Sequence, residues 1–500
     1  MRIIGNNPQL SRQTQGTASG AITGGKPVIV NTDGTVSTTT SQSSVTQSVG
    51  SETGFTTNAS SFMSTAFDTN AEKMVIAWND NGSAGTARVA TVSGTSISYG
   101  TAVVFENANS QDMSMTFDSN SNRVVISYRD YGNSQYGTAI VGAVSGTDIS
   151  FGTPVVFESA SAAESKIAFD SSNNKVVIVY YDEGDGNKGK AIVGTVDSSD
   201  NSISFGSAVV YETGEARENG IVFDSSNNKM IIVYKDVNNA NRGTAIVGTV
   251  SGTSISFGSS VTFDDQTYVA GQPAQEIAAA FDSNSNRVVI VYSDRNDGKK
   301  GTGVVGVVSG TSISFGTPVV YETGAILATH GNAIGFDSSV NKMVVAFVDD
   351  DDSNKAKFVI GTVDSSDNSI SFTSATVFNT GDSTEALYID PIGFDTTNNK
   401  IVIAFRDSDS YGKAIVLQVA GTATSFNLTS ENFIGFAEDT VADGQPVTIN
   451  TKGAIDENQS SLTPAQQYFV QTDGTLGTSA DDPSVVAGTA VTATKLIVKG

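Results

Sequence analysis

A repeated phrase constrains this chain more than any other feature. Each copy consists of a Phe-Asp pair, a short polar turn and an apolar run that ends in a second Asp, always 12 residues after the first. The seven copies are spaced 50, 52, 54, 58, 55 and 58 residues apart, so the chain is a repeat array. The pairs are Phe67 and Asp68, Phe117 and Asp118, Phe169 and Asp170, Phe223 and Asp224, Phe281 and Asp282, Phe336 and Asp337, and Phe394 and Asp395.

Each repeat contains four short stretches with the composition of β-strands. In the third copy these are 166–170 (KIAFD), 175–182 (KVVIVYYD), 190–196 (KAIVGTV) and a run beginning at 202 (SISF), separated by Gly, Asn and Ser turns. Seven units of about 50 residues with four antiparallel strands each predict a seven-bladed β-propeller. A linear β-solenoid is the alternative, but its rungs are usually shorter and do not need a fixed number.

The two ends of the chain predict how the ring closes. The seventh copy lacks a fourth strand, whereas 46–54 (TQSVGSETG) resembles the end of a fourth strand at 207–214 (SAVVYETG). We expect this N-terminal segment to complete the last blade and to remove two open sheet edges. The alternating strands at 24–36, 443–453 and 467–476 predict one small β-sandwich or barrel built from both ends. The expected organisation is therefore an N-terminal arm and first part of a split anchor domain at 1–40, the propeller at 41–427, and the second part of the anchor at 428–500.

Composition excludes several classes of function. The chain has 28 Lys and Arg against 52 Asp and Glu, and a net charge of −24 disfavours nucleic-acid binding. With no Cys and a single His, His330, it cannot build a thiolate nucleophile or a Cys- or His-based zinc site, and we expect no Ser-His dyad because His330 has no evident partner. No apolar run reaches the roughly 18 residues of a membrane span, and the first 15 residues lack the apolar core of a secretory signal. We therefore expect that the protein is made in the cytoplasm and does not insert into a membrane.

Propeller geometry places the second Asp of each copy on the face formed by the loops after the second and fourth strands. The seven residues are Asp80, Asp130, Asp182, Asp236, Asp294, Asp349 and Asp407. Acidic loops on this face suggest a calcium hypothesis, and the loop with Asp349, Asp350, Asp351 and Asp352 is the best metal candidate. However, no loop has EF-hand spacing, and an Asp that accepts hydrogen bonds from its own turn explains the pattern more simply.

The loops on this face vary in length and carry scattered aromatic residues, so they are where we expect binding. The binding-face candidates are Tyr131, Tyr136, Tyr268, His330 and Tyr411, because Tyr stacks on sugar rings and donates a hydrogen bond. Ordinary loop packing is the alternative explanation for each of them.

No catalytic or cofactor-binding residue can be assigned from the sequence. Gly301, Gly303 and Gly306 form GxGxxG, but they fall within an expected strand where a dinucleotide site needs a strand, a turn and a helix. Trp78, the one Trp, replaces the Tyr or Phe of the other copies and is expected in the core. A carboxylate-based polysaccharide hydrolase remains an alternative, although no carboxylate pair stands out.

The terminal segments resemble those of virion structural proteins of tailed bacteriophages, especially marine ones. The similar segments are 18–36 (ASGAITGGKPVIVNTDGTV), 432–440 (NFIGFAEDT), 461–478 (SLTPAQQYFVQTDGTLGT) and 487–500 (AGTAVTATKLIVKG). The resemblance covers about 110 of the 500 residues and names no catalytic residue.

The resemblance implies a non-enzymatic, tail-fibre-like protein located in the virion. Its partners would be other virion proteins at the terminal β domain, further copies of itself, and a glycan or protein of the host surface at the propeller. The alternatives are a purely structural head decoration or tail component, a polysaccharide-degrading enzyme and a bacterial adhesin.

Overall fold

The structure, a computed structural model, describes residues 12–31, 33–39, 44–264, 275–327, 332–380, 392–423, 427–481 and 483–499. The chain forms two compact units, Thr46–Gly421 and the combined ends Met1–Val45 and Thr422–Gly500. Almost all of the regular structure is β-strand, and none of the helical turns in the described ranges is long or apolar enough to cross a membrane.

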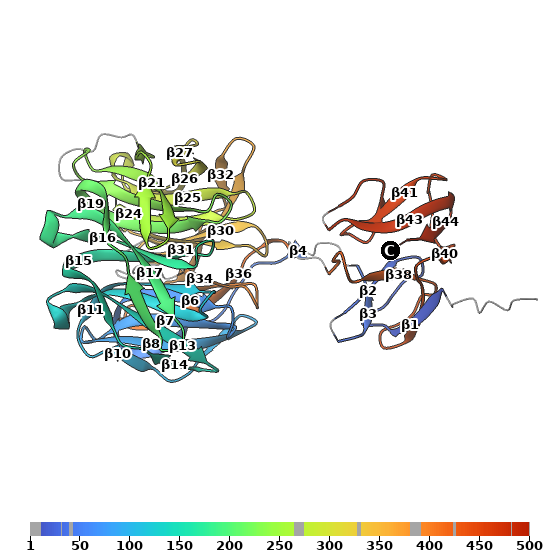
Figure 1. The fold of residues 1–500 in the computed structure, drawn as a ribbon, viewed down its shortest axis with the longest axis horizontal. Helices are drawn as coiled ribbons and strands as arrows, with labels where there is room; N and C mark the ends of the chain where they lie inside the picture. The colour runs from blue at the N-terminus through green and yellow to red at the C-terminus, as the bar shows by residue number, and fades with distance from the viewer. Residues whose placement is uncertain are drawn as a thin grey trace, which may run out of the picture. The chain divides into compact units, whose positions relative to one another are not determined.

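The described strands of Thr46–Gly421 form a seven-bladed β-propeller (Figure 1), as the sequence predicted. We call the strands of a blade a to d, from the strand that carries the Phe-Asp pair outward. The a strands are the last part of β6 (Thr53–Asp68), β11 (Ser110–Asp118), the last parts of β15 (Val155–Asp170) and β19 (Val209–Asp224), β24 (Gln275–Asp282), β29 (Asn332–Asp337) and β34 (Ile392–Asp395). The b strands are β7 (Lys73–Asp80), β12 (Arg123–Asp130), β16 (Lys175–Asp182), β20 (Lys229–Asp236), β25 (Arg287–Asp294), β30 (Lys342–Asp349) and β35 (Lys400–Arg406).

The outer half of each blade is less regular than its inner half. The c strands are β8 (Ala84–Ser93), β13 (Tyr136–Ser145), β17 (Lys188–Asp197), β21 (Arg242–Ser251), β26 (Lys300–Ser309), β31 (Lys355–Asp364) and β36 (Tyr411–Gln418). Each d strand consists of two pieces that both pair with strand c, where the sequence predicted one continuous strand. The first pieces are β9 (Ser96–Tyr99), β14 (Asp148–Phe151), β18 (Ser202–Phe205), β22 (Ser254–Phe257), β27 (Ser312–Phe315), β32 (Ser369–Phe372) and β5 (Ser48–Val49). The second pieces are β10 (Val103–Glu106), the starts of β15, β19 and β6, β23 (Val261–Thr262), β28 (Val319–Ala325) and β33 (Thr376–Asn379).

The N-terminal strand closes the ring. β5 pairs with β36 through Val49 and Leu417, and the start of β6 continues the pairing through Thr53 and Ala414. The predicted closure is confirmed by these pairs. The seventh blade therefore joins residues more than 350 positions apart, whereas the described strands of each of the other six blades follow one another in the sequence.

Aromatic side chains hold adjacent blades together. Phe157, at the start of β15, packs against Tyr180 and Phe205 of the next blade, with ring centroids 5.2 and 5.8 Å away. The same arrangement at the closure places Phe55 5.1 Å from Trp78, which is 1% exposed. Trp78 therefore belongs to the core, as predicted.

The Asp of each Phe-Asp pair, which ends strand a, has the expected role in the turn that follows. The carboxylate of Asp170 accepts hydrogen bonds from the backbone amides of Ser172 and Asn173, and the other six Phe-Asp pairs make equivalent bonds. The central channel between the a strands is narrow, with a cavity of 180 Å³. Each blade contributes to its wall, mostly with small or apolar side chains: Thr65, Met115, Ile167, Ile221, Ala279, Ile334 and Ile392.

The chain ends form a β-sandwich of two five-stranded sheets. One sheet has the order β1 (Gln13–Thr17), β39 (Pro446–Asn450), β38 (Phe433–Ala437), β2 (Pro27–Val30) and β3 (Val36–Thr38). The other has the order β40 (Ile455–Asp456), β44 (Lys495–Val498), β43 (Val485–Thr492), β41 (Gln467–Val470) and β42 (Leu476–Gly477). Ile29 and Phe436 of the first sheet share one core with Val470 and Leu496 of the second. N-terminal and C-terminal strands thus lie side by side (Figure 1), and β4 (Ser44–Val45) and β37 (Gly421–Thr422) form a separate two-stranded sheet.

Candidate functional site

The loops between strands b and c are fixed by the Asp at the end of strand b. The Oδ1 atom of Asp130 accepts hydrogen bonds from the backbone amides of Gly132 and Asn133 at 2.8 and 3.1 Å. Asp182, Asp236, Asp294, Asp349 and Asp407 also accept bonds from their own loops. Three of these loops form a short helical turn: η1 (Tyr131–Asn133), η2 (Glu183–Asp185) and η3 (Arg295–Asp297). The structural interpretation of these six Asp residues is confirmed, whereas Asp80 accepts a bond from Asn58 instead.

Most carboxylates of the acidic loop proposed for calcium form ion pairs with lysines. The Nζ atom of Lys357 lies 2.6 Å from Asp349 and 2.9 Å from Asp352, and Lys355 lies 2.8 Å from the other oxygen of Asp352. Asp351 accepts a bond from the backbone amide of Ala325, and Asp350 lies 3.3 Å from Lys299. No group of three or more acidic or His side chains in the described ranges is arranged to hold a metal ion. The geometry therefore gives the calcium hypothesis no support at this loop.

The predicted binding-face residues do not form one cluster. Tyr131 lies in η1 of the second blade and is 39% exposed, whereas Tyr411 begins β36 of the seventh blade and is 41% exposed. Tyr136 begins β13 and is half-buried. Tyr268 and His330 lie outside the described residues. Tyr131 is brought against a charged side chain that the sequence did not single out.

That side chain is Arg129, the residue before the capping Asp of β12. Its guanidinium carbon lies 5.4 Å from the ring centre of Tyr131, a cation–π arrangement. Its Nη2 atom donates to Ser161 at 2.6 Å and to Glu183 of the next blade at 2.8 Å, and it also contacts Gln135. The side chain is only 12% exposed, so these bonds hold Arg129 in one orientation.

A second Arg-Tyr pair continues this cluster into the fourth blade. The guanidinium carbon of Arg217 lies 4.8 Å from the ring centre of Tyr181, and its Nη1 atom donates to the Tyr181 hydroxyl at 3.0 Å. The Tyr181 hydroxyl in turn lies 3.4 Å from Glu183, and burial raises the pKa of Tyr181. We call Arg129, Tyr131, Ser161, Tyr181, Glu183 and Arg217 the rim cluster. It is a continuous network of donors and acceptors across three blades.

Four carboxylates lie in the a strands of the same part of the ring. Asp112, Glu164, Glu218 and Glu276 occupy one equivalent position, five residues before the Phe of each Phe-Asp pair. Each has a positive φ, between 49° and 59°, and marks the bulge where the pairing of strands a and b shifts register. We call these residues the carboxylate chain.

The carboxylate chain links neighbouring blades. The Glu164 amide donates to Asp112 at 3.1 Å, the Glu218 amide donates to Glu164, and the Glu276 amide donates to Glu218 at 3.2 Å. Burial, followed by the charges of Glu218 and Asp112, raises the pKa of Glu164 to about 8. Burial also raises the pKa of Asp112. The raised pKa favours the protonated form of Glu164, which relieves repulsion along the chain.

Two nearby cations partly balance the remaining charge. Arg129 lies 4.0 Å from Asp112, and Lys235, which is 5% exposed, lies 3.6 Å from Glu218. Arg129 therefore belongs to both networks, and it connects the rim cluster to the carboxylate chain.

The sequence contained a signal for both networks, in the differences between repeats rather than in their common phrase. The carboxylate chain could have been found by comparing the position five residues before each Phe-Asp pair. The rim cluster could have been found by comparing the residues immediately before and after the second Asp of each copy, because these two residues form a different pair in every repeat. They are Asn79 and Asn81, Arg129 and Tyr131, Tyr181 and Glu183, Lys235 and Val237, Ser293 and Arg295, Val348 and Asp350, and Arg406 and Ser408.

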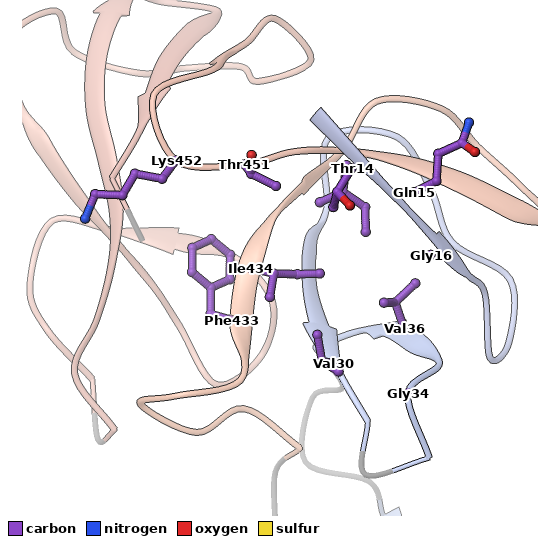
Figure 2. A pocket seen from close by; sticks show the side chains of 11 residues that line it. Thr14, Gln15, Gly16, Val30, Gly34, Val36, Phe433, Ile434, Thr451 and Lys452 are labelled. Atoms are coloured by element: carbon purple, nitrogen blue, oxygen red, sulfur yellow. The ribbon is translucent and has the colours of Figure 1, made fainter. Parts of the chain in front are cut away.

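The sandwich carries a separate groove of 450 Å³ (Figure 2). Phe433 and Ile434 of β38 line it together with Val30 and Val36, and Lys452 lies at one side. The groove is open, and its lining is largely apolar. Nothing in the described residues indicates what covers it.

The fold defines the class of this protein: an all-β chain with a seven-bladed propeller inserted into a small sandwich. No protein-family model and no curated protein matches it. Three solved β-propeller structures are similar to it at low identity. Sqt1 of Saccharomyces cerevisiae is 9% identical with a TM-score of 0.44, over 74% of this chain and 99% of that one.

Two further structures are similar at the same low level of identity. The periplasmic gluconolactonase PpgL of Pseudomonas aeruginosa is 11% identical with a TM-score of 0.45, over 74% of this chain and 97% of that one. A mutant of AofleA from Arthrobotrys oligospora is 10% identical with a TM-score of 0.42, over 84% of this chain and 94% of that one. The similar structures thus include an enzyme, and they do not determine whether this chain is one.

Proposed function

We propose that this chain is a virion structural protein of a tailed bacteriophage whose propeller attaches the particle to the host surface. The sandwich would bind other virion proteins, and the propeller would bind a surface glycan or protein. The protein would be located in the virion, as a tail-fibre-like component.

One observation carries this proposal. All four segments that resemble phage virion proteins, 18–36, 432–440, 461–478 and 487–500, fall within the unit formed by the two chain ends. None of them falls within Thr46–Gly421. A compact unit with the resemblance, interrupted by a second compact unit without it, is the arrangement expected of a particle-binding module that carries a diverse insert.

We further propose that the propeller binds rather than catalyses. Asp112, Glu164 and Glu218 are each engaged by the backbone amide of the next blade, which is an architectural use of a carboxylate. The rim cluster, in contrast, combines exposed aromatic and charged groups that are held in fixed orientations. This combination favours recognition.

The test is immunogold electron microscopy of intact phage particles with an antibody against the propeller, together with an adsorption assay. Label at fibre tips or the tail end, and inhibition of phage adsorption by the purified chain, are the expected results. Label spread over the head would replace attachment with a decorating role. Absence of label from every particle would overturn the virion assignment.

A further inference from the structure

We propose that the rim cluster binds a neutral saccharide, with the ring of Tyr131 as its stacking surface. This inference rests on the proposed attachment function and names the ligand class and the site. It depends on three properties of the cluster: an exposed ring held in place, hydrogen-bonding groups of both kinds beside it, and a balanced local charge.

The first property is the fixed, exposed ring. Tyr131 is 39% exposed, and η1, which carries it, is held by two backbone bonds to the buried Asp130. Arg129 supports the ring from within the protein. A ring that is already ordered loses little conformational entropy on binding, and aromatic side chains provide a large contact area at low entropic cost.

The second property is a set of planar polar groups linked to the ring through Arg129, which contacts Glu183, and through Tyr181, which connects Glu183 to Arg217. The side chain of Glu183 is 36% exposed and that of Arg217 is 37% exposed, while Ser161 connects Arg129 to Glu183. A sugar presents hydroxyl groups that both donate and accept. Carboxylate and guanidinium groups whose orientation is fixed by their own neighbours match that pattern.

The third property is charge. The cations Arg129 and Arg217 are balanced by Glu183 and by Glu215, which contacts Arg217. Next to this neutral cluster lies the carboxylate chain, and the whole protein has a net charge of −24. An acidic saccharide would be repelled by this field, so we expect a neutral one.

The site is expected once in the ring. At the position of Arg129 the other blades have Asn79, Tyr181, Lys235, Ser293, Val348 and Arg406. Only Arg406 repeats the guanidinium, and the residue that corresponds to Tyr131 is then Ser408. Tyr411, at the start of β36 just after that loop, has nearly the same exposure as Tyr131, which makes it a matched control.

The experiment measures binding of the purified full-length chain to sensor surfaces coated with dextran, mannan, galactan, β-glucan or the acidic polymer polygalacturonate. We expect binding to at least one neutral polymer and none to polygalacturonate. Tyr131→Ala and Glu183→Gln should each weaken binding about tenfold or more. Tyr131→Phe should retain most of the affinity because it keeps the stacking ring, and Tyr411→Ala should leave it unchanged.

Three results would overturn the inference: no binding to any neutral polymer, binding to polygalacturonate alone, or equal affinity of the natural protein and Tyr131→Ala. Thermal unfolding of each variant ensures that a loss of binding is not a loss of folding. If the chain blocks phage adsorption but Tyr131→Ala blocks it equally well, attachment stands and this site is wrong. If the chain binds a neutral polymer through Tyr131 but is absent from particles, the site stands and the virion assignment is wrong.

Discussion

The carboxylate of Glu164 accepts a hydrogen bond from the backbone amide of Glu218, 54 residues later in the chain and one blade further around the ring. The amide is available because Glu218 has a positive φ of 53°, which bulges strand a and turns its N–H out of the sheet. Such a conformation costs a non-glycine residue about 1 kcal/mol. The bond to Glu164 offsets that cost and aligns the two blades.

This relationship predicts how stability depends on pH. Because the pKa of Glu164 is raised to about 8 in the folded state, its contribution is fully present below the unfolded pKa of about 4.5 and is lost as the pH rises through 8. Glu164→Gln keeps an accepting oxygen but cannot ionise. We expect the variant to match the natural protein in Tm near pH 5 and to exceed it at pH 9.

The control for this prediction is Glu72→Gln, which changes an exposed carboxylate in a turn of the first blade. It tests whether the removal of any one carboxylate from this acidic chain is enough to raise Tm at pH 9. A Glu164→Gln variant that is less stable than the natural protein at pH 9 would show that the folded pKa is lowered instead.

The contact between Phe55 and Trp78 makes closure of the ring observable. Trp78 is the one Trp of the chain, and Phe55 reaches it from the N-terminal strand that completes the seventh blade. Phe55→Ala should cost about 3–5 kcal/mol and leave a cavity beside the indole. We expect red-shifted Trp emission and greater acrylamide quenching of the folded variant.

Phe157→Ala is the matched comparison, since Phe157 makes the same contact with Tyr180 between the second and third blades. It should lower Tm by a similar amount without changing native Trp emission. Unchanged emission of folded Phe55→Ala would contradict the proposed closure.

Gly189 lies beneath an aromatic ring and should not accept a side chain. A Cβ atom there would lie 2.5 Å from two ring carbons of Tyr211, which is 7% exposed. Gly189→Ala should therefore cost about 1–3 kcal/mol, measured as a fall in Tm. Gly54→Ala, where the nearest atom would be 3.8 Å away, should change Tm little, and equal losses in the two variants would contradict the prediction.

Lys357 should stabilise the acidic loop in the way that a metal ion would. The Asp349 side chain is 6% exposed, so Lys357→Met would leave a buried carboxylate without its cation and should cost about 3 kcal/mol. Lys300→Met, which removes the more exposed pair with Asp297, should cost less than about 1 kcal/mol. A calcium-dependent rise in Tm that disappears in Asp352→Asn would show that this loop binds the metal after all.

The sequence by itself determined the parts of this protein that are repeated. Seven copies of one phrase predicted the blades, and the Asp at each end of the phrase predicted capped turns because its partners are two or three residues away. The segment 46–54 repeats the sequence pattern of a fourth strand, and this local pattern was enough to predict that it closes the ring.

Only the tertiary structure decided which non-repeated residues meet. Arg129 and Glu183 are 54 residues apart, and so are Glu164 and Glu218, yet each pair is in contact because the ring places one repeat beside the next. A strand pattern shows which residues lie at a strand end, but it does not show the bulge that turns the amide of Glu218 outward or the loop geometry that stacks Tyr131 on Arg129. The local sequence pattern is sufficient to specify the blades and their turns, whereas the packing of blades around one axis determines which residues meet in the rim cluster.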